Sequence, residues 1–272
     1  MHPFTRRETD RKTHGKPFLE SFWEKGELQK VKNFRPIEAE DIRSPGMPSV
    51  CLGKVGNKDL WFKGYEQTYL ERDLRELSQV GNIMLFRNLL RLAALRTGQI
   101  LSVSQLGRDA RLNSATTSRY LSLLEASFIA YRLYPYLNNR ASRLVKTPKL
   151  YFTDSGLASF LVGTDYGKGA LFETYIAQNT IGIIDAEIPD AKVYFRNIQG
   201  RHEVDFVIEK GNRFIAVEIK DKKRWDTGDL SGLKAFIEAT PQCIAGVLSY
   251  NGTETVRLGE KLWAAPAGMI IS

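Results

Sequence analysis

The chain is poor in the residue types that build disulfide frameworks and soft-metal sites: among 272 residues there are two cysteines and three histidines. Cys51 and Cys243 stand alone, without ligand-like spacing, so we expect them to be reduced thiols of a cytoplasmic protein. His2, His14 and His202 form no metal motif. A disulfide-stapled secreted fold and a zinc domain are therefore excluded.

Long apolar runs are also missing. No stretch approaches the roughly 20 apolar residues that span a bilayer, and the opening MHPFTRRETDRKTHGK lacks the apolar centre of a secretory signal. A G-x-x-x-x-G-K-[ST] phosphate loop is absent as well, so the chain is not expected to be an ATPase by itself. The sequence predicts a cytoplasmic protein without a membrane partner.

The overall composition is that of an ordinary globular chain, with 43% hydrophobic and 26% charged residues. Its length suits one large domain or two to three small ones. The formal net charge of +8 permits a nucleic-acid partner, although many basic proteins have none.

The most informative stretch is residues 202–220, HEVDFVIEKGNRFIAVEIK. Apolar and polar residues alternate on both sides of Gly211 and Asn212, and a Gly-Asn pair between two such runs predicts a two-residue hairpin loop. With Lys210 opposite Arg213, the pattern fixes the register of the two strands.

This register places Asp205 opposite Glu218 and Glu203 opposite Lys220, all on one face of the sheet. Like charges directly opposite each other destabilise a strand pair, so a cation is expected between the two acids. Mg²⁺ prefers such hard oxygen ligands, and the Ile219 main-chain carbonyl is a further candidate ligand. Lys220 could orient an attacking hydroxide or stabilise a phosphate, while Glu203 could pair with Lys220 and tune it.

Asp205 followed by the Glu-x-Lys of Glu218 and Lys220 resembles the core of the PD-(D/E)xK nuclease superfamily, with Val204 in place of the proline. The superfamily's order of helix, three strands, helix and strand is matched by the predicted elements. These are a helix at 169–184, a strand at 192–197, the hairpin, a helix at 230–239 and a strand at 243–249.

The resemblance also implies a first-helix acid, which the Gly-x-x-Phe-Glu ending at Glu173 supplies. Taken by itself, Glu173 is better explained as a solvated helix glutamate. The resemblance implies catalytic roles for Glu173, Asp205, Glu218 and Lys220, with Mg²⁺ or Mn²⁺ held by Asp205, Glu218 and Glu173.

Residues 104–136 are typical of a winged helix-turn-helix: a helix from Ser104, a turn at 112–114, a helix at 115–126 and an alternating strand at 129–136. If this segment binds DNA, the candidate contacts are Arg108, Arg111, Ser114, Thr116, Thr117, Arg119 and Tyr120. The alternative is a winged helix used for packing or protein contact, because fold does not fix function.

Three further features flank this segment. Residues 61–99 predict two amphipathic helices, the first with a stripe of Tyr65, Tyr69, Leu70, Leu74 and Leu77. A basic run of Arg140, Arg143, Lys146 and Lys149 either follows a nucleic-acid backbone or is a solvated connector. Asp154 is expected to cap a helix.

Several segments between residues 60 and 272, among them YEQTYLERDLREL, KLYFTDSGLASFL, GALFETYI and AVEIK, together resemble domain of unknown function 4143, the C-terminal region of prokaryotic AAA+-type ATPases. The family's ATPase domain is absent here, which suggests a truncated, split or decayed gene product. The resemblance implies an α/β plus α fold. We expect a divergent, irregular segment with short helices at 1–60, a winged-helix-like domain at 61–150 and a PD-(D/E)xK restriction-endonuclease-like α-βββ-α-β domain at 151–272.

The function expected on these grounds is nucleic-acid binding with a Mg²⁺-dependent deoxyribonuclease activity. The alternative is a catalytically inactive DNA- or protein-binding module that works with an ATPase in trans.

Overall fold

A computed structural model describes residues 2–28, 30–68, 81–137, 143, 146–163, 167–198 and 202–272. Unit 1 comprises Met1–Phe4, Glu40–Arg132 and Thr147–Gln178, and unit 2 comprises Thr5–Ala39, Leu133–Lys146 and Asn179–Ser272. Tyr69, Leu70, Leu74, Leu77 and Arg140, which the sequence analysis singled out, lie outside the described residues. The boundaries predicted near residues 60 and 150 divide the chain into consecutive stretches, whereas each unit combines several separate stretches. The predicted boundaries therefore stay a prediction.

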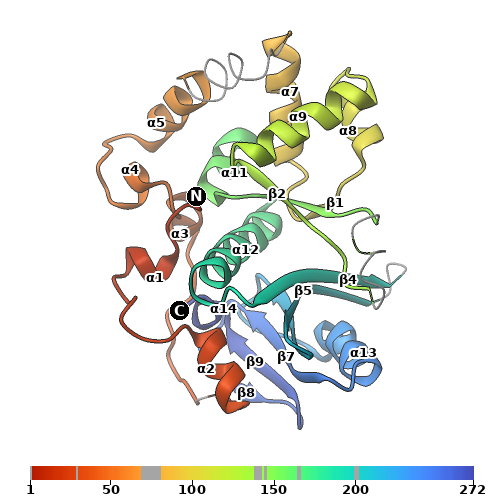
Figure 1. The fold of residues 1–272 in the computed structure, drawn as a ribbon. Helices are drawn as coiled ribbons and strands as arrows, with labels where there is room; N and C mark the ends of the chain where they lie inside the picture. Colours follow the sequence, from red (N-terminus) through yellow and green to blue (C-terminus); the bar gives the residue numbers. More distant parts are fainter. Residues whose placement is uncertain are drawn as a thin grey trace. The chain divides into compact units, whose positions relative to one another are not determined.

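Unit 1 is mainly helical (Figure 1). Its elements are α4 (Pro48–Cys51), α5 (Lys58–Tyr65), α7 (Ile83–Ala94), β1 (Gln99–Ile100), α8 (Val103–Asp109), α9 (Ser114–Ala126), β2 (Ala130–Leu133), β3 (Lys149–Phe152) and α11 (Ser155–Val162), with α3 (Ala39–Arg43) starting at its border. Short polar side chains begin several of these helices by accepting backbone N–H bonds, as expected at helix N-termini. Asp154 does so for α11, with its Oδ1 2.8 Å from the Leu157 nitrogen, which confirms the predicted cap.

The described strands of unit 1 form a three-stranded sheet in the order β1-β3-β2. The strand predicted at 129–136 is shorter in the structure and ends at Leu133. Proline has no N–H to continue a strand ladder, and Pro135 forms an isolated bridge with Phe195 in unit 2 instead.

Unit 2 is built on a six-stranded mixed sheet in the order β4-β5-β6-β7-β9-β8. Its elements are β4 (Ala191–Ile198), β5 (His202–Lys210), β6 (Arg213–Lys220), the short 3₁₀ helix η2 (Thr227–Leu230), α13 (Ser231–Ala239), β7 (Cys243–Tyr250), β8 (Val256–Arg257), β9 (Leu262–Pro266) and α14 (Ala267–Ile270). The strand β6 is antiparallel to β5 and parallel to β7. The helix α13 connects β6 to β7 and packs on β5, β6 and β7, as a parallel connection requires.

The helix α12 (Lys168–Glu187) starts in unit 1 and ends in unit 2. It matches the helix predicted at 169–184, and β4, α13 and β7 match the predicted elements within a residue or two. The mixed α/β class expected from the sequence is thereby confirmed.

The segment Thr5–Ala39 belongs to unit 2 and is tied to the C-terminal part of the chain. Its helices are α1 (Arg6–Thr9) and α2 (Phe18–Lys25). The Phe18 nitrogen donates to the Ser272 carbonyl at 2.8 Å, and the Phe34 nitrogen donates to the Thr253 carbonyl at 2.9 Å. The expected irregular structure with short helices is confirmed, whereas these long-range bonds have no signal in the local sequence pattern.

None of the helices within the described ranges has the length and apolar character needed to cross a membrane.

Candidate active site

The candidate site in unit 2 is set by the β5–β6 hairpin. Gly211 adopts φ +62°, a conformation that glycine tolerates better than other residues, and so allows the tight turn. Lys210 pairs with Arg213 as predicted, and the ladder continues to Phe206 opposite Val217. The predicted register of the hairpin is confirmed from the turn to this pair, and the opposition of Asp205 to Glu218 and of Glu203 to Lys220 stays a prediction.

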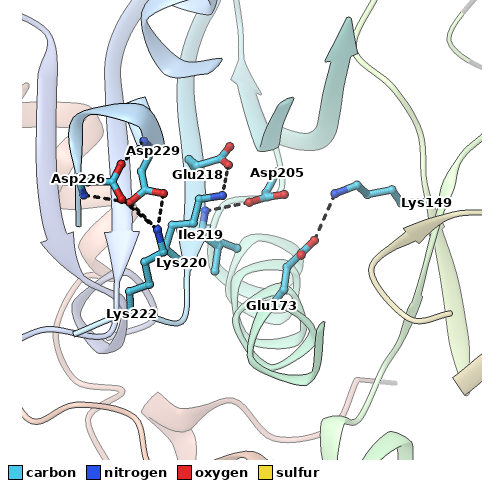
Figure 2. A network of polar contacts seen from close by, with 9 residues as sticks. All are labelled: Lys149, Glu173, Asp205, Glu218, Ile219, Lys220, Lys222, Asp226 and Asp229. Carbon is cyan, nitrogen blue, oxygen red and sulfur yellow. Dashed lines mark hydrogen bonds and ion pairs between the residues drawn. The ribbon is translucent and has the colours of Figure 1, made fainter. Parts of the chain in front are cut away.

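Asp205 is the first carboxylate of the site and is only 5% exposed. Its Oδ2 accepts a hydrogen bond of 2.8 Å from the Ile219 nitrogen on the neighbouring strand (Figure 2). This hydrogen bond to the backbone of the neighbouring strand therefore fixes the orientation of the carboxylate on the sheet.

Glu218 is the second carboxylate and is equally buried, at 6% exposed. Its Oε1 accepts a 2.7 Å hydrogen bond from Lys220 Nζ, whereas its Oε2 is buried and has no hydrogen-bond partner among the described residues. Burial, and then the charge of Asp205, raise the pKa of Glu218 to about 8. The site therefore favours a proton or a cation at Glu218 near neutral pH.

Lys220 supplies the positive charge of the site. Burial acts to lower the pKa of Lys220, but the charge and hydrogen bond of Glu218 outweigh it, with help from Asp205 and Asp229, so the pKa is raised. About a third of the side chain is exposed. The raised pKa favours the charged ammonium, which is partly exposed to solvent.

A polar cluster that the sequence analysis missed stands beside Lys220 in Figure 2. Lys222 Nζ lies 2.9 Å from Asp229 Oδ1 and 3.2 Å from Asp226 Oδ2. Asp226 and Asp229 also form the capping box of η2. The D-x-x-D spacing is the sequence signal that could have revealed this cluster.

Glu203 is exposed, and its charge adds to the raised pKa of Glu218. The predicted pairing of Glu203 with Lys220 stays a prediction.

Glu173 lies on α12 in unit 1, whereas Asp205, Glu218 and Lys220 lie in unit 2. Its Oε1 is 3.3 Å from Lys149 Nζ and also accepts a hydrogen bond from the Tyr151 hydroxyl. Both partners come from β3, and this pairing was not predicted from the sequence. Glu173 is thus not a freely solvated helix glutamate.

Two residues of the predicted basic run, Arg143 and Lys149, fit neither a nucleic-acid contact nor a solvated connector. Lys149 is 3% exposed and Arg143 is 5% exposed, and both form ion pairs, Lys149 with Glu173 and Arg143 with Glu209. Unpaired charges are too costly to bury, so each acquires a counter-charge. These two residues neither follow a nucleic-acid backbone nor form a solvated connector.

Within the described ranges, no group of three or more His, Cys, Asp or Glu side chains is placed to hold a metal ion. Asp205 and Glu218 are a pair of carboxylates on one sheet, and the predicted third ligand belongs to the other unit.

The predicted DNA-contact surface is partly retained on α8 and α9. Arg108, Arg111, Ser114 and Arg119 are exposed and Thr116 is half-buried.

Two predicted contacts are wrong, because Thr117 and Tyr120 are buried. The Thr117 hydroxyl donates to the Asn113 carbonyl at 2.8 Å, and the Tyr120 ring packs edge-on against Phe86 at 5.3 Å. The Tyr120 contact joins α9 to α7, whereas the Thr117 bond lies within α9, and neither side chain faces solvent.

Two family models, both of domains of unknown function, match parts of this chain. Residues 168–270 match the family model of domain of unknown function 4143, and residues 44–167 match that of domain of unknown function 8612, each covering less than half of the chain. The resemblance expected over residues 60–272 is confirmed for its C-terminal part, and the preceding residues match a different model.

Among curated proteins, the uncharacterized protein Rv2008c of Mycobacterium tuberculosis and the uncharacterized protein Mb2031c of Mycobacterium bovis are similar to this chain. Each is 27% identical over 233 residues, which cover 83% of this chain and 51% of the relative. The chain therefore spans about half the length of these relatives.

Two solved structures show weak similarity. Protein VC1899 from Vibrio cholerae is 19% identical, with 79% of this chain and 52% of that chain covered and a TM-score of 0.25. An assembly of Thermococcus gammatolerans McrB AAA+ hexamers with bound McrC is 12% identical, with 96% and 66% covered and a TM-score of 0.29. Similarity at this level carries no conclusion about fold or function.

Proposed function

We propose that this chain is a metal-dependent phosphodiesterase that acts on DNA, with Asp205, Glu218 and Lys220 at its centre. The observation that carries the proposal is the buried Glu218 Oε2, which has no hydrogen-bond partner among the described residues and belongs to a carboxylate whose ionisation Asp205 opposes. A buried acceptor without a donor is rare in native proteins and is costly unless something binds it.

A divalent metal suits this pair of side chains. Asp205 and Glu218 offer hard carboxylate oxygens, for which Mg²⁺ and Mn²⁺ have high affinity, and a dication would relieve the repulsion between them. When bound, such an ion would polarise a phosphate and activate water. Glu173 and the Ile219 carbonyl are proposed as additional ligands, and the Glu173 contacts with Lys149 and Tyr151 would then have to loosen.

The chain's own groups would do the remaining work. Asp205 is oriented by the Ile219 N–H, and the ammonium of Lys220 would orient water or neutralise charge that develops on the phosphate. Because the pKa of Lys220 is raised, this group stays charged throughout the physiological range.

The order of elements supports a PD-(D/E)xK-like domain. Along the chain, α12 is followed by β4, β5, β6, α13 and β7, with the carboxylates and the lysine on the second and third strands. The parallel pairing of β6 with β7 through α13 gives the sheet its mixed character.

A DNA-binding role is proposed for α8 and α9. The order α7, β1, α8, α9, β2, β3 supports a winged-helix-like unit, and Arg108, Arg111 and Arg119 are three exposed cations on it. Such contacts would supply affinity for phosphates independently of sequence.

The decisive experiment is cleavage of plasmid, linear duplex and single-stranded DNA by purified protein, with Mg²⁺, Mn²⁺ or EDTA. Wild type should cleave only with metal, while Asp205→Asn, Glu218→Gln and Lys220→Met should each lose at least about a hundredfold in rate. Asp190→Asn and Lys223→Met, matched changes at exposed residues, should retain wild-type rates. Cleavage that survives in Asp205→Asn or Glu218→Gln would refute the assignment.

A binding module without catalysis is the second candidate. It is favoured by the lack of a three-ligand cluster among the described residues and by the Lys220 ammonium, which already neutralises one oxygen of Glu218. Absence of cleavage by the wild type, together with a gel shift of DNA that Arg108→Gln and Arg119→Gln weaken, would establish this second function instead.

A further inference from the structure

The loop between β6 and η2, residues 221–226, begins directly after the candidate site. Lys220 is the last residue of β6, and η2 packs back against the same strand. Figure 2 shows the side chains of Lys222, Asp226 and Asp229 beside Lys220. Both ends of the loop therefore lie next to the proposed centre.

Ion pairs join the two sides of this loop. Lys222, near its start, donates to Asp226 at its end, at 3.2 Å, and to Asp229 on η2, at 2.9 Å. The Asp226 nitrogen in turn donates to Asp229 Oδ2 at 3.0 Å, as part of the capping box of η2. These contacts restrict the conformations of the loop tip, residues 223–225. A contact surface that is ordered in advance loses less entropy when it binds a ligand.

Arg224 is a cation at this tip. It is exposed, and its side chain has no hydrogen bond or ion pair with any other described residue. A guanidinium presents five N–H donors in a planar arrangement that matches phosphate oxygens. Arg224 follows Lys220 by four residues, which span at most about 14 Å when fully extended. A phosphate on Arg224 would therefore lie within a few nucleotides of one at Lys220 on the same strand.

Trp225, the next residue, is an aromatic group with two surroundings. It packs against the hydrophobic cluster that α13 forms with the sheet, yet the residue is only half-buried. Its indole N–H has no hydrogen-bond partner within the described ranges. A tryptophan that is anchored on a core and partly open to solvent suits the stacking of an unpaired base, and such stacking accepts every base.

We propose that Arg224 and Trp225 bind single-stranded DNA beside the candidate centre, with a phosphate on Arg224 and an unpaired base stacked on Trp225. This inference rests on the proposed function, because the bound strand is the one that the centre would cleave. It deepens that function by naming unpaired DNA as the substrate form. The bases of a duplex are already stacked on one another, so a duplex gains nothing from Trp225.

The experiment measures binding of the full chain by the fluorescence anisotropy of labelled DNA, in EDTA so that no metal-dependent cleavage occurs. The probes are a single strand of about 12 nucleotides, within the range that single-strand sites cover, and its duplex. Salt at about 150 mM reduces non-specific attraction to the basic protein. Trp225→Leu should weaken single-strand binding at least about fivefold and leave duplex binding unchanged. Equal weakening of both forms, or of neither, would overturn the proposal.

The phosphate contact has its own test. Arg224→Gln should weaken single-strand binding and reduce the slope of log affinity against log salt by about 0.7, the value for one phosphate contact on a single strand. Arg257→Gln, the same change at an exposed arginine of β8, should leave both quantities unchanged. A slope that is the same in the wild type and in Arg224→Gln would overturn this contact.

A second readout does not depend on whether Trp225→Leu folds. Single-stranded DNA should quench the tryptophan fluorescence of the wild type. Trp225→Phe keeps a ring for stacking, so it should bind within about threefold of the wild type but lose most of this quenching. Of the three other tryptophans, Trp23 and Trp263 are buried and Trp61 is half-buried in unit 1. Quenching that persists undiminished in Trp225→Phe would overturn the stacking.

Failure of this inference is distinguishable from failure of the proposed function. Single-strand binding that depends on Trp225, without cleavage in Mg²⁺ or Mn²⁺, would refute the nuclease and support the strand contact. Metal-dependent cleavage, with single-strand binding that Trp225→Leu leaves unchanged, would support the nuclease and refute the strand contact.

Discussion

Two ion pairs among the described residues of unit 2 each include a buried glutamate, Glu209 or Glu218, and they differ in how completely their charges are satisfied. Arg143 Nη1 lies 2.6 Å from Glu209 Oε2, and the Arg143 Nε donates to the Leu137 carbonyl at 2.6 Å. The guanidinium also lies over the rings of Tyr136 and Tyr194, 4.5 and 4.6 Å from their centroids. This pair has the hydrogen bonds and aromatic contacts of a structural element.

The pair formed by Glu218 and Lys220 is different. One Glu218 oxygen has no hydrogen-bond partner among the described residues, a second acid opposes its ionisation, and the lysine reaches solvent. Burial of charge alone therefore does not mark a functional site. The informative feature is a buried charged group with an oxygen that lacks a hydrogen-bond donor. Such an atom lowers the stability of the folded state, and strongly shifted buried groups of this kind are common at functional sites.

The largest change in stability is expected from Glu209→Gln. It leaves the Arg143 guanidinium buried without a counter-charge, and such losses cost about 3 to 5 kcal/mol. Urea unfolding of the variant beside Glu260→Gln, an exposed control, measures the difference. A loss no larger than in the control would mean that the pair is not structural.

The next largest effect is a pH dependence from Glu218. Its pKa is raised from 4.5 to about 8 on folding, so the folded state holds a proton that the unfolded state has released over this interval. The free energy of unfolding should therefore fall as pH rises from about 4.5 to about 8, by at most roughly 1.4 kcal/mol per pH unit, and level off above.

Glu218→Gln should remove this fall, and millimolar Mg²⁺ should reduce it in the wild type if the ionised pair binds metal. Urea unfolding at a series of pH values measures both effects. An identical slope in the wild type and in Glu218→Gln would contradict the raised pKa.

A smaller effect is expected from Asp205→Asn. The amide oxygen can still accept the Ile219 N–H bond, but the negative charge that opposes Glu218 is gone. The variant should be about 1 kcal/mol more stable than the wild type at pH 9, and the pH midpoint of Glu218 should move below 8. A destabilised variant with an unchanged midpoint would show that Asp205 acts only through its hydrogen bond.

The smallest effect is expected from Lys222→Met. Lys222 pairs with Asp226 and Asp229 but nearly half of its side chain is exposed, so solvent screens the interaction. Thermal unfolding should not distinguish the variant from the wild type. A clear drop in melting temperature would place Lys222 with the structural pairs.

Local features were predictable because they depend on neighbours in the sequence. The Gly211 turn, the Lys210–Arg213 register and the Asp154 cap follow from backbone conformation and short-range hydrogen bonds. The convergence of Asp205, Glu218 and Lys220 followed as well, since one hairpin carries all three.

Burial between distant segments was not predictable. Thr117 and Tyr120 carry polar atoms and were expected on a surface, yet both are buried, and Tyr120 packs on the neighbouring helix α7. Lys149 and Arg143 looked like a solvent-facing basic run because their counter-charges, Glu173 and Glu209, stand 24 and 66 residues away. The periodicity of apolar and polar residues does not predict partners so far apart in the sequence.

The sequence by itself determined the period-two strands, the turn between them and the set of charged side chains on one face, since these depend on local geometry. The tertiary structure alone decided which charged groups have a full set of partners and which have an unsatisfied atom, because burial depends on the segments that cover each residue. It placed Lys149 beside Glu173, left Glu218 Oε2 without a partner among the described residues and brought Arg6 to the end of the chain.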